Sequence, residues 1–158
     1  MSETHDHRTA PECAVRPLRE EDRAAWEILW RGYQEFYRAE PDARMTELTW
    51  ARFQDPGEPM FALGAFRSGE LRGIVHYIFH RSCWTAGPYC YLQDLFTARG
   101  FRGTGIGRSL IGAVYAAAAE AGASRVYWLT HESNAEAMKL YDKIAERTGF
   151  VQYRKLLK

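Results

Sequence analysis

The stretch that decides the fold is Arg102-Gly103-Thr104-Gly105-Ile106-Gly107-Arg108-Ser109-Leu110. It follows a β-like run, Tyr89–Thr97, and opens an alanine-rich segment typical of a helix. Because glycine has no side chain, the backbone here can approach a ligand closely and adopt dihedral angles that other residues avoid. Backbone N–H groups converge at a helix N-terminus, and two arginines flank the glycines. The stretch therefore predicts a loop that binds a pyrophosphate.

The spacing of the glycines separates this loop from two common nucleotide motifs. The dinucleotide fingerprint G-x-G-x-x-G fails because its last glycine would fall on Arg108 or on the leucine two residues later. The P-loop fails because Ile106-Gly107 stands where Lys followed by Ser or Thr is needed. The pattern that fits is Arg/Gln-x-x-Gly-x-Gly/Ala, met by Arg102, Gly105 and Gly107. Taken alone, this pattern leaves open a glycine-rich turn that binds no ligand.

Length and composition limit the class of protein to which the chain can belong. The chain has 158 residues, of which 46% are hydrophobic and 14% aromatic, as expected of a folded domain with a core. We predict one domain over residues 13–158, preceded by a flexible N-terminal tail over residues 1–12. The formal net charge of +1 argues against a nucleic-acid partner. No apolar run approaches the ~20 residues of a membrane span, so we expect no membrane partner.

The cysteines and histidines point to a reducing compartment and to no metal. Three cysteines are an odd number and do not suggest a disulfide framework, so we expect a cytoplasmic protein. His76 and His80 would share one face of a strand, with Cys83 and Cys90 nearby. Their spacing matches neither C-x-x-C nor H-E-x-x-H, and we predict no metal site.

The pattern of apolar residues and breakers predicts the order of strands and helices. We expect strands at residues 14–18, 60–66, 71–80, 89–97, 125–130 and 150–156, and helices at about residues 20–38, 46–54, 105–121 and 134–147. Ser133 and Glu136 form a capping box at the start of the last helix. The strands from 60 to 97 form an antiparallel meander. The strand–helix–strand unit from 89 to 130 is a crossover, so its strands run parallel and the fold class is mixed α/β.

A second motif follows the predicted parallel strands. It reads N-x-x-A-x-x-L-Y, from Asn134 to Tyr141, and is followed by Gly149-Phe150. The two motifs, in this order, resemble the GNAT superfamily of N-acetyltransferases. The resemblance implies a mixed sheet with an antiparallel N-terminal half and parallel strands that splay around acetyl-CoA, the cosubstrate. It also implies a homodimer.

Within that family, residues 91–97, Tyr-Leu-Gln-Asp-Leu-Phe-Thr, are similar to the histone and polyamine branch of spermidine/spermine type. One difference bears on the substrate. The polyamine enzymes carry an acidic pair where this chain has Gln93-Asp94. This halves the carboxylate charge expected beside the acceptor amine.

The resemblance assigns roles to particular residues. An alkylammonium has a pKa near ~10 and must lose a proton, and Asp94 is the carboxylate expected to take it. Tyr141 is expected to protonate the leaving thiolate, and it could instead be a packed helix residue. Asp94 could likewise be a structural residue that caps backbone or pairs with an arginine. The acceptor site is expected to include Tyr33, Tyr37, Gln93 and Asp94. The two tyrosines belong to an aromatic stripe on the first predicted helix, and aromatic residues at helical spacing are also typical of a core. The stripe consists of Trp26, Trp30, Tyr33, Phe36 and Tyr37.

The cosubstrate is expected to bind backbone and side-chain groups from separate stretches of the chain. Backbone N–H groups of Leu95 and Thr97 would stabilise the negative charge that develops on the thioester oxygen. The full set expected to bind acetyl-CoA is Leu95, Phe96, Thr97, Arg102, Gly103, Thr104, Gly105, Ile106, Gly107, Arg108, Asn134 and Tyr141.

These residues predict an enzyme that transfers the acetyl group of acetyl-CoA to a primary amine. The amine could belong to a polyamine, an amino acid or lysine analogue, or a protein. A non-catalytic acyl-CoA-binding module would keep the loop at residues 102–107 without needing Asp94 or Tyr141. An acyltransferase that uses a longer acyl group is a third possibility.

Overall fold

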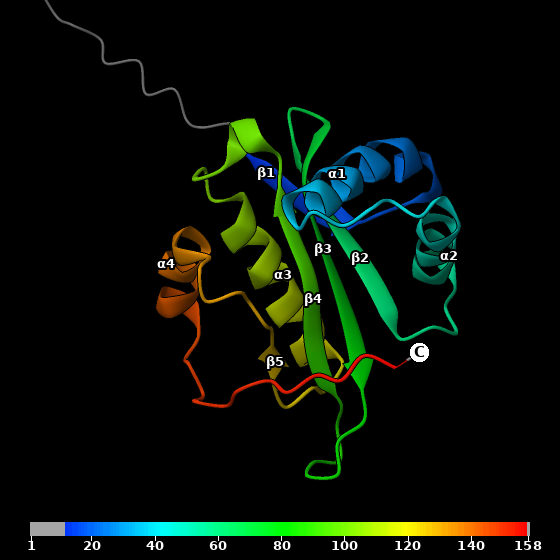
Figure 1. Cartoon of the computed structure of the whole chain (residues 1–158). Coiled ribbons are helices and arrows are strands. Elements are labelled where there is room, and N and C mark those ends of the chain that lie inside the picture. Colours follow the sequence, from blue (N-terminus) through cyan, green and yellow to red (C-terminus); the bar gives the residue numbers. More distant parts are fainter. Residues whose placement is uncertain (1–11, 158) are drawn as a thin grey trace, which may run out of the picture. The chain divides into compact units, whose positions relative to one another are not determined.

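The computed structural model describes residues 12–157, which form two compact units divided after Trp128 (Figure 1). The first unit contains a five-stranded sheet with the order β1-β2-β3-β4-β5. Its strands are β1 (Cys13–Pro17), β2 (Met60–Arg67), β3 (Glu70–His80), β4 (Tyr89–Thr97) and β5 (Val126–Tyr127). Its helices are η1 (Glu20–Asp22), α1 (Arg23–Phe36), α2 (Ala43–Gln54), η2 (Arg99–Phe101) and α3 (Ile106–Glu120).

The sheet has the mixed topology that the sequence predicts. Strands β1 to β4 pair antiparallel in chain order, and β5 pairs parallel to β4 after the crossover through α3. The expected mixed α/β fold is therefore confirmed. No helix within residues 12–157 combines the length and hydropathy needed to cross a bilayer. The predicted N-terminal tail lies almost entirely outside the described residues.

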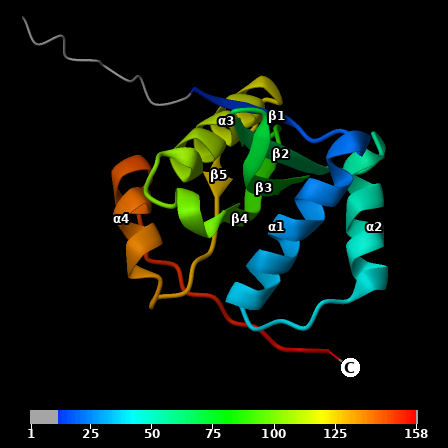
Figure 2. The same ribbon diagram turned by 90° about the horizontal axis from the view of Figure 1, so that it is seen from above.

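Helices cover both faces of this sheet, with α1 and α2 on one face and α3 on the other (Figure 2). Helix α3 lies close to the sheet at Gly73 of β3. A Cβ atom at that position would come within 2.5 Å of Ile106 Cγ2 and 3.0 Å of Leu110 Cδ1. The buried side chains of α3 are Ile106, Leu110, Ile111, Val114 and Ala118. This face of the sheet is packed by aliphatic groups.

The face covered by α1 and α2 is packed by aromatic rings. Trp26 of α1 is fully buried, and its ring centroid lies 4.9 Å from that of Trp50 on α2. Phe53 meets the same indole edge-on at 6.1 Å. The aromatic stripe predicted on the first helix thus has its N-terminal half in the core.

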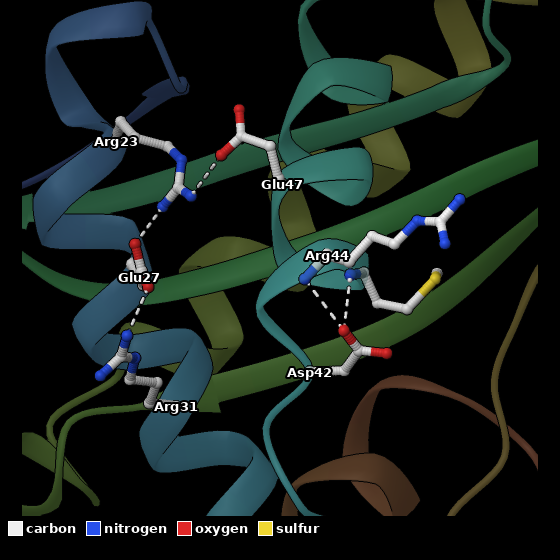
Figure 3. Close-up of polar contacts among 7 residues, drawn as sticks. Arg23, Glu27, Arg31, Asp42, Arg44 and Glu47 are labelled. Carbon is white, nitrogen blue, oxygen red and sulfur yellow. Dashed lines mark hydrogen bonds and ion pairs between the residues drawn. The ribbon is translucent and has the colours of Figure 1, made fainter.

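Charged side chains on the surface connect α1 to α2 (Figure 3). Arg23 pairs with Glu27 one turn along α1 and with Glu47 of α2, the latter at 3.1 Å. Glu27 also receives Arg31 at 2.7 Å. Asp42 caps the start of α2 by accepting hydrogen bonds from the backbone N–H groups of residues 44 and 45. This cap explains why α2 begins three residues before the predicted start.

A partly buried ion pair anchors the chain just before α1. Arg16 of β1 donates two hydrogen bonds to Asp22, at 2.6 and 3.0 Å, and the backbone N–H of Arg19 donates a third at 2.8 Å. The hydrogen bond from Arg16 is the main cause that holds the pKa of the Asp22 carboxyl below its usual value. The turn into α1 is therefore fixed to the sheet by charge.

The second unit, residues 129–157, contains α4 (Ala135–Ile144). Three predictions fail around it. The strand expected at residues 125–130 is only the two residues of β5, because its partner β4 pairs with it only at Cys90 and Tyr91. Residues 150–156 form no strand. The predicted capping box is absent, because Ser133 Oγ lies 2.7 Å from His131 Nδ1 and Asn134 takes the N-cap position.

Candidate functional site

A β-bulge in β4 places Asp94 on the α1 face of the sheet. In the pairing of β3 with β4, Asp94 lies opposite His76 and Leu92 lies opposite Tyr77, so Gln93 is the extra residue. Neighbouring residues of β3 point to opposite faces, and the residues paired with them do the same. Leu92 and Asp94, two residues apart, therefore lie on opposite faces. The bulge moves the carboxylate from the aliphatic face to the aromatic one.

The Asp94 carboxylate lies in a buried hydrogen-bonded chain. Its Oδ2 atom is 3.0 Å from Nδ1 of His76, and Nε2 of His76 accepts a hydrogen bond of 2.9 Å from the indole N–H of Trp26. The Tyr33 hydroxyl also interacts with Asp94. Burial, and after it the negative charge of Asp94, raise the pKa of that hydroxyl. Tyr33 therefore stays protonated and donates toward the carboxylate.

A cavity of about 300 Å³ is lined by Trp30, Tyr33, Gln34, Tyr37 and Ala39. Tyr33 contributes to both the cavity wall and the contact with Asp94. The rings of Tyr33 and Tyr37 meet edge-on, with centroids 4.9 Å apart. The structure thus brings together three residues predicted for the acceptor site. The fourth, Gln93, is exposed at the bulge.

Two buried polar atoms in residues that line this cavity make no hydrogen bond within residues 12–157. The indole nitrogen Nε1 of Trp30 and the amide oxygen Oε1 of Gln34 are buried, and neither finds a hydrogen-bond partner within residues 12–157. Leaving a buried donor or acceptor unpaired costs roughly 1–3 kcal/mol, so such groups suit a bound polar ligand. Sequence reasoning missed both residues, because the helical spacing of the aromatic stripe carries no information on hydrogen bonding.

The C-terminal half of β4 has one open edge. Strand β5 pairs with β4 only at Cys90 and Tyr91, whereas β3 pairs with β4 as far as Thr97. The backbone N–H of Ala98 donates to Arg72 of β3. Because successive N–H groups of a strand point to opposite edges, those of Leu95 and Thr97 point to the open edge. The side chain of Phe96, in contrast, is buried in the core on the α1 face.

The glycine loop leads directly into α3. Gly103 and Gly105 have positive φ angles of 73° and 87°, which other residues adopt only with strain, and Gly105 is the N-cap of the helix. Thr104 is held by a hydrogen bond from its hydroxyl to the carbonyl of Phe101 and by one from Arg67 to its own carbonyl. The loop is therefore fixed in shape before any ligand binds.

The first turn of α3 has the donors that a pyrophosphate needs. The backbone N–H groups of Ile106, Gly107 and Arg108 have no carbonyl within the helix to which they could donate. The helix dipole adds positive potential at the same end. Atoms added at Gly103 or Gly105 would meet nothing within 4 Å, so the space above the loop is open. The residues present thus fit a diphosphate group.

Arg102, at the first position of the loop motif, lies toward α1. Its guanidinium carbon is 5.5 Å from the ring centroid of Phe36 and 5.8 Å from that of Phe96. Tyr33 packs edge-on against the same Phe96 ring, at 6.1 Å. A cation and the hydroxyl that contacts Asp94 therefore flank one aromatic side chain. The sequence motif did not predict this orientation of the side chain.

Two predicted site residues belong to the second unit. The Asn134 side chain donates a hydrogen bond of 3.2 Å to the Thr130 hydroxyl, which orients the amide at the start of α4. Tyr141 lies two turns further along this helix and is half-buried. Their predicted roles, with the pantetheine and with the sulfur, stay predictions.

Comparison with known proteins identifies the family. The profile of the Acetyltransferase (GNAT) family matches residues 23–145, which is most of the chain. The chain belongs to the GNAT family. It is 35% identical over 143 residues to the D-amino-acid N-acetyltransferase HPA3 of Saccharomyces cerevisiae, covering 89% of each protein. Membership makes the chain an acetyl-CoA-dependent acyltransferase, whereas the polyamine branch gains no specific support.

Solved structures agree on the GNAT fold. A ribosomal-protein-alanine N-acetyltransferase of Brucella melitensis superposes with a TM-score of 0.78 at 22% identity, over 92% of this chain and 99% of that one. The aminoglycoside N-acetyltransferase AAC(6')-Iy in complex with CoA gives 0.78 at 17% identity, over 94% and 97%. In the GNAT chain described here, no group of three or more potential metal ligands occurs within residues 12–157.

Proposed function

We propose that this GNAT enzyme acetylates the primary amine of a small acceptor bound in the aromatic cavity beside Asp94. The observation that carries the proposal is the position of Asp94, which a bulge turns to the face where a cavity of about 300 Å³ opens. Aromatic faces attract an ammonium group, and a carboxylate beside them can accept its proton. The same face of the sheet would thus supply both a binding site for the ammonium group and a base, Asp94, that accepts its proton.

In the proposed reaction, an ammonium N–H bond breaks and an O–H bond forms on Asp94, alone or through a water molecule. The freed nitrogen lone pair forms a bond to the acetyl carbon, the carbon–sulfur bond breaks, and the sulfur takes the phenolic proton of Tyr141. The nitrogen loses its second proton to solvent as the amide forms, and the Tyr141 phenolate regains a proton from solvent. Acetyl-CoA supplies the activated acetyl group. The N–H groups of Leu95 and Thr97 would stabilise the charge that develops on the carbonyl oxygen.

Binding of the cosubstrate is proposed for the loop at residues 102–108 and the first turn of α3. Their N–H groups and the side chain of Arg108 would bind the diphosphate, and Asn134 would bind amide groups of the pantetheine. The fixed loop conformation reduces the ordering cost on binding. Substitution of Gly105, whose φ is 87°, should therefore raise the KM for acetyl-CoA.

Among the possible amines, we propose that amino acids are the preferred class, ahead of polyamines and protein amines. Asp94 gives the site one carboxylate for an ammonium group. Arg102, which flanks Phe96 together with Tyr33, gives it one cation for a carboxylate. An amino acid carries both complementary charges, whereas a polyamine carries only positive ones. The 35% identity to a D-amino-acid N-acetyltransferase supports the same class.

The experiment that tests this proposal measures CoA release from acetyl-CoA with purified protein and a panel of amines. The panel pairs D- and L-phenylalanine with phenethylamine, which lacks the carboxylate, and adds spermidine, lysine, thialysine and a histone-tail peptide. We expect the highest kcat/KM with an amino acid. Calorimetric binding of acetyl-CoA without turnover of any acceptor would instead support the non-catalytic binding module.

A pair of arginine variants distinguishes the two ligands. Arg102→Ala should raise the KM for amino acids about 10- to 100-fold and leave that for phenethylamine unchanged, since a charged hydrogen bond contributes roughly 1.5–3 kcal/mol. Arg108→Ala, in the first turn of α3, should raise the KM for acetyl-CoA with every acceptor. If Arg102→Ala raises only the KM for acetyl-CoA, Arg102 binds the diphosphate, as its motif predicts.

We also propose a cellular location and an assembly state. The three cysteines, Cys13, Cys83 and Cys90, are free thiols in the described chain, which supports a reducing, cytoplasmic location. A homodimer is proposed on the family resemblance. Sedimentation equilibrium of the purified protein measures the assembly state, and a mass of about 18 kDa would contradict it.

A further inference from the structure

The proposed base has a fixed supporting residue on the neighbouring strand. His76 of β3 is 2% exposed and lies directly opposite Asp94 in the strand pairing. Trp26, fully buried on α1, reaches the far side of the same imidazole. We propose that His76, locked in one tautomer by Trp26, is a positioning residue that orients and stabilises the ionised carboxylate of Asp94. This inference rests on the proposed function, in which Asp94 is the base.

The tautomer of His76 follows from the chemistry of its partners. The indole Nε1–H of Trp26 can only donate a hydrogen bond, so His76 Nε2, at 2.9 Å, must accept and carries no proton. The ring proton of the imidazole therefore resides on Nδ1. That N–H donates to Asp94 Oδ2 at 3.0 Å. A doubly protonated ring would place two N–H groups against each other at Trp26.

The surroundings of the imidazole hold it in this orientation. Ring centroids of Phe53 and Trp30 lie 4.5 and 5.2 Å from that of His76, and Trp26 lies at 6.0 Å. Of the groups that titrate, Asp94 contacts the imidazole directly and Tyr33 contacts Asp94 in turn. A hydrogen bond in such an apolar environment is stronger than one in water. The side chain therefore cannot turn to another partner without leaving a buried polar atom unpaired.

This arrangement defines what His76 does and does not do. It donates to one oxygen of Asp94, which fixes the plane of the carboxylate and favours its ionised form, the form that accepts a proton. It does not carry the acceptor's proton onward, because Nε2 is occupied by the indole N–H. The proton removed from the amine stays on Asp94 until solvent takes it. His76 is thus a positioning residue and not a second base.

The first test reads the tautomer in the intact enzyme. Nitrogen-15 chemical shifts of the neutral His76 imidazole should show a protonated Nδ1 and an unprotonated Nε2. A neutral ring protonated on Nε2 instead would overturn the proposal without any substitution. Trp26→Phe keeps an aromatic ring and removes the donor to Nε2. In this variant the proton of the neutral imidazole should be found on either ring nitrogen.

The second test compares two substitutions whose side chains have the same number and branching of heavy atoms. His76→Asn keeps a donor close to the position of Nδ1, and His76→Leu removes it. We expect His76→Leu to lower kcat about 10- to 100-fold, as loss of an orienting partner does at other sites, with the KM for acetyl-CoA unchanged. His76→Asn should restore most of kcat, because it restores a donor to Asp94.

Controls separate this role from simple packing. Ile74→Val lies two residues earlier on the same face of β3 and should alter stability while leaving kcat unchanged. If His76→Leu and His76→Asn have equal kcat, the positioning role is wrong. If Asp94→Asn keeps full activity, the base assignment in the proposed function fails instead. Should His76→Leu not fold, the tautomer measurement and Trp26→Phe still decide the question.

Discussion

The two faces of the sheet in the first unit are packed by different chemistry. The buried side chains of α3 are aliphatic and close-packed on one face, where Ile106 and Leu110 pack onto Gly73. The α1 face combines aromatic rings with buried polar groups, such as His76, and with a cavity. Tight aliphatic packing supplies rigidity but leaves no room for a ligand. The comparison suggests that the α3 face supports the fold and the loop, whereas the α1 face carries acceptor chemistry.

The largest expected effect removes the base from the α1 face. Asp94→Asn keeps the shape of the side chain and should lower kcat about 10²- to 10⁴-fold, because proton transfer from the ammonium loses its acceptor. Steady-state CoA release measures the loss, and thermal melting verifies the fold. Asp55→Asn, at an exposed turn, is the matched control and should keep full activity. Unchanged turnover in Asp94→Asn would place the chemistry elsewhere.

The next effect is on stability and tests the α3 face. Leu110→Ala removes a fully buried side chain and should lower the free energy of unfolding by about 3 kcal/mol, from lost burial and the cavity left behind. Urea unfolding followed by circular dichroism measures the change. Leu110→Met, which conserves volume, should cost less than about 1.5 kcal/mol. Equal losses in the two variants would contradict close packing on this face.

Local sequence chemistry predicted the parts of the site that depend on neighbouring residues. The loop at residues 102–108, its helix and β4 followed from glycine spacing and apolar pattern. The face on which Asp94 lies could not be predicted, because it depends on how β4 pairs with β3 and on the bulge at Gln93. The contacts of His76 join residues 18 and 50 positions apart in the chain, which no local pattern records. The shortness of β5 could not be predicted either, because the length of a strand depends on how far it pairs with its neighbour, here β4.

A third prediction concerns the charged anchor at the start of α1 and its dependence on pH. The pKa of Asp22 is lowered in the folded protein, so its contribution to stability is present above the ordinary carboxyl pKa and is lost as pH falls below it. Asp22→Asn should cost about 2 kcal/mol at pH 7, the value of a hydrogen bond to a charged group. The melting curves of variant and wild type should converge as the pH falls below the lowered pKa of the Asp22 carboxyl.

The neighbouring Glu21→Gln supplies the control for this prediction. Glu21 is mostly exposed and lies 3.8 Å from Arg19, so its removal should change the melting temperature little at any pH. A difference between Asp22→Asn and the wild type that persists in acid would mean that the ion pair with Arg16 is not its cause. Helix α1 would then depend on packing alone, as α3 does.

The smallest effect concerns the ion pair between α1 and α2. Glu47→Gln removes the partner of Arg23 on α2, but Arg23 keeps Glu27, and Glu47 is 72% exposed. Exposed pairs contribute about 0.2–1 kcal/mol, and salt screens them. The loss in unfolding free energy should therefore be at most about 1 kcal/mol in dilute buffer and should disappear in 1 M salt. Glu35→Gln, at an exposed position near the end of α1, is the control. A loss that salt does not reduce would show that α2 is positioned through Glu47 itself, and then the aromatic face would depend on charge as much as on its rings.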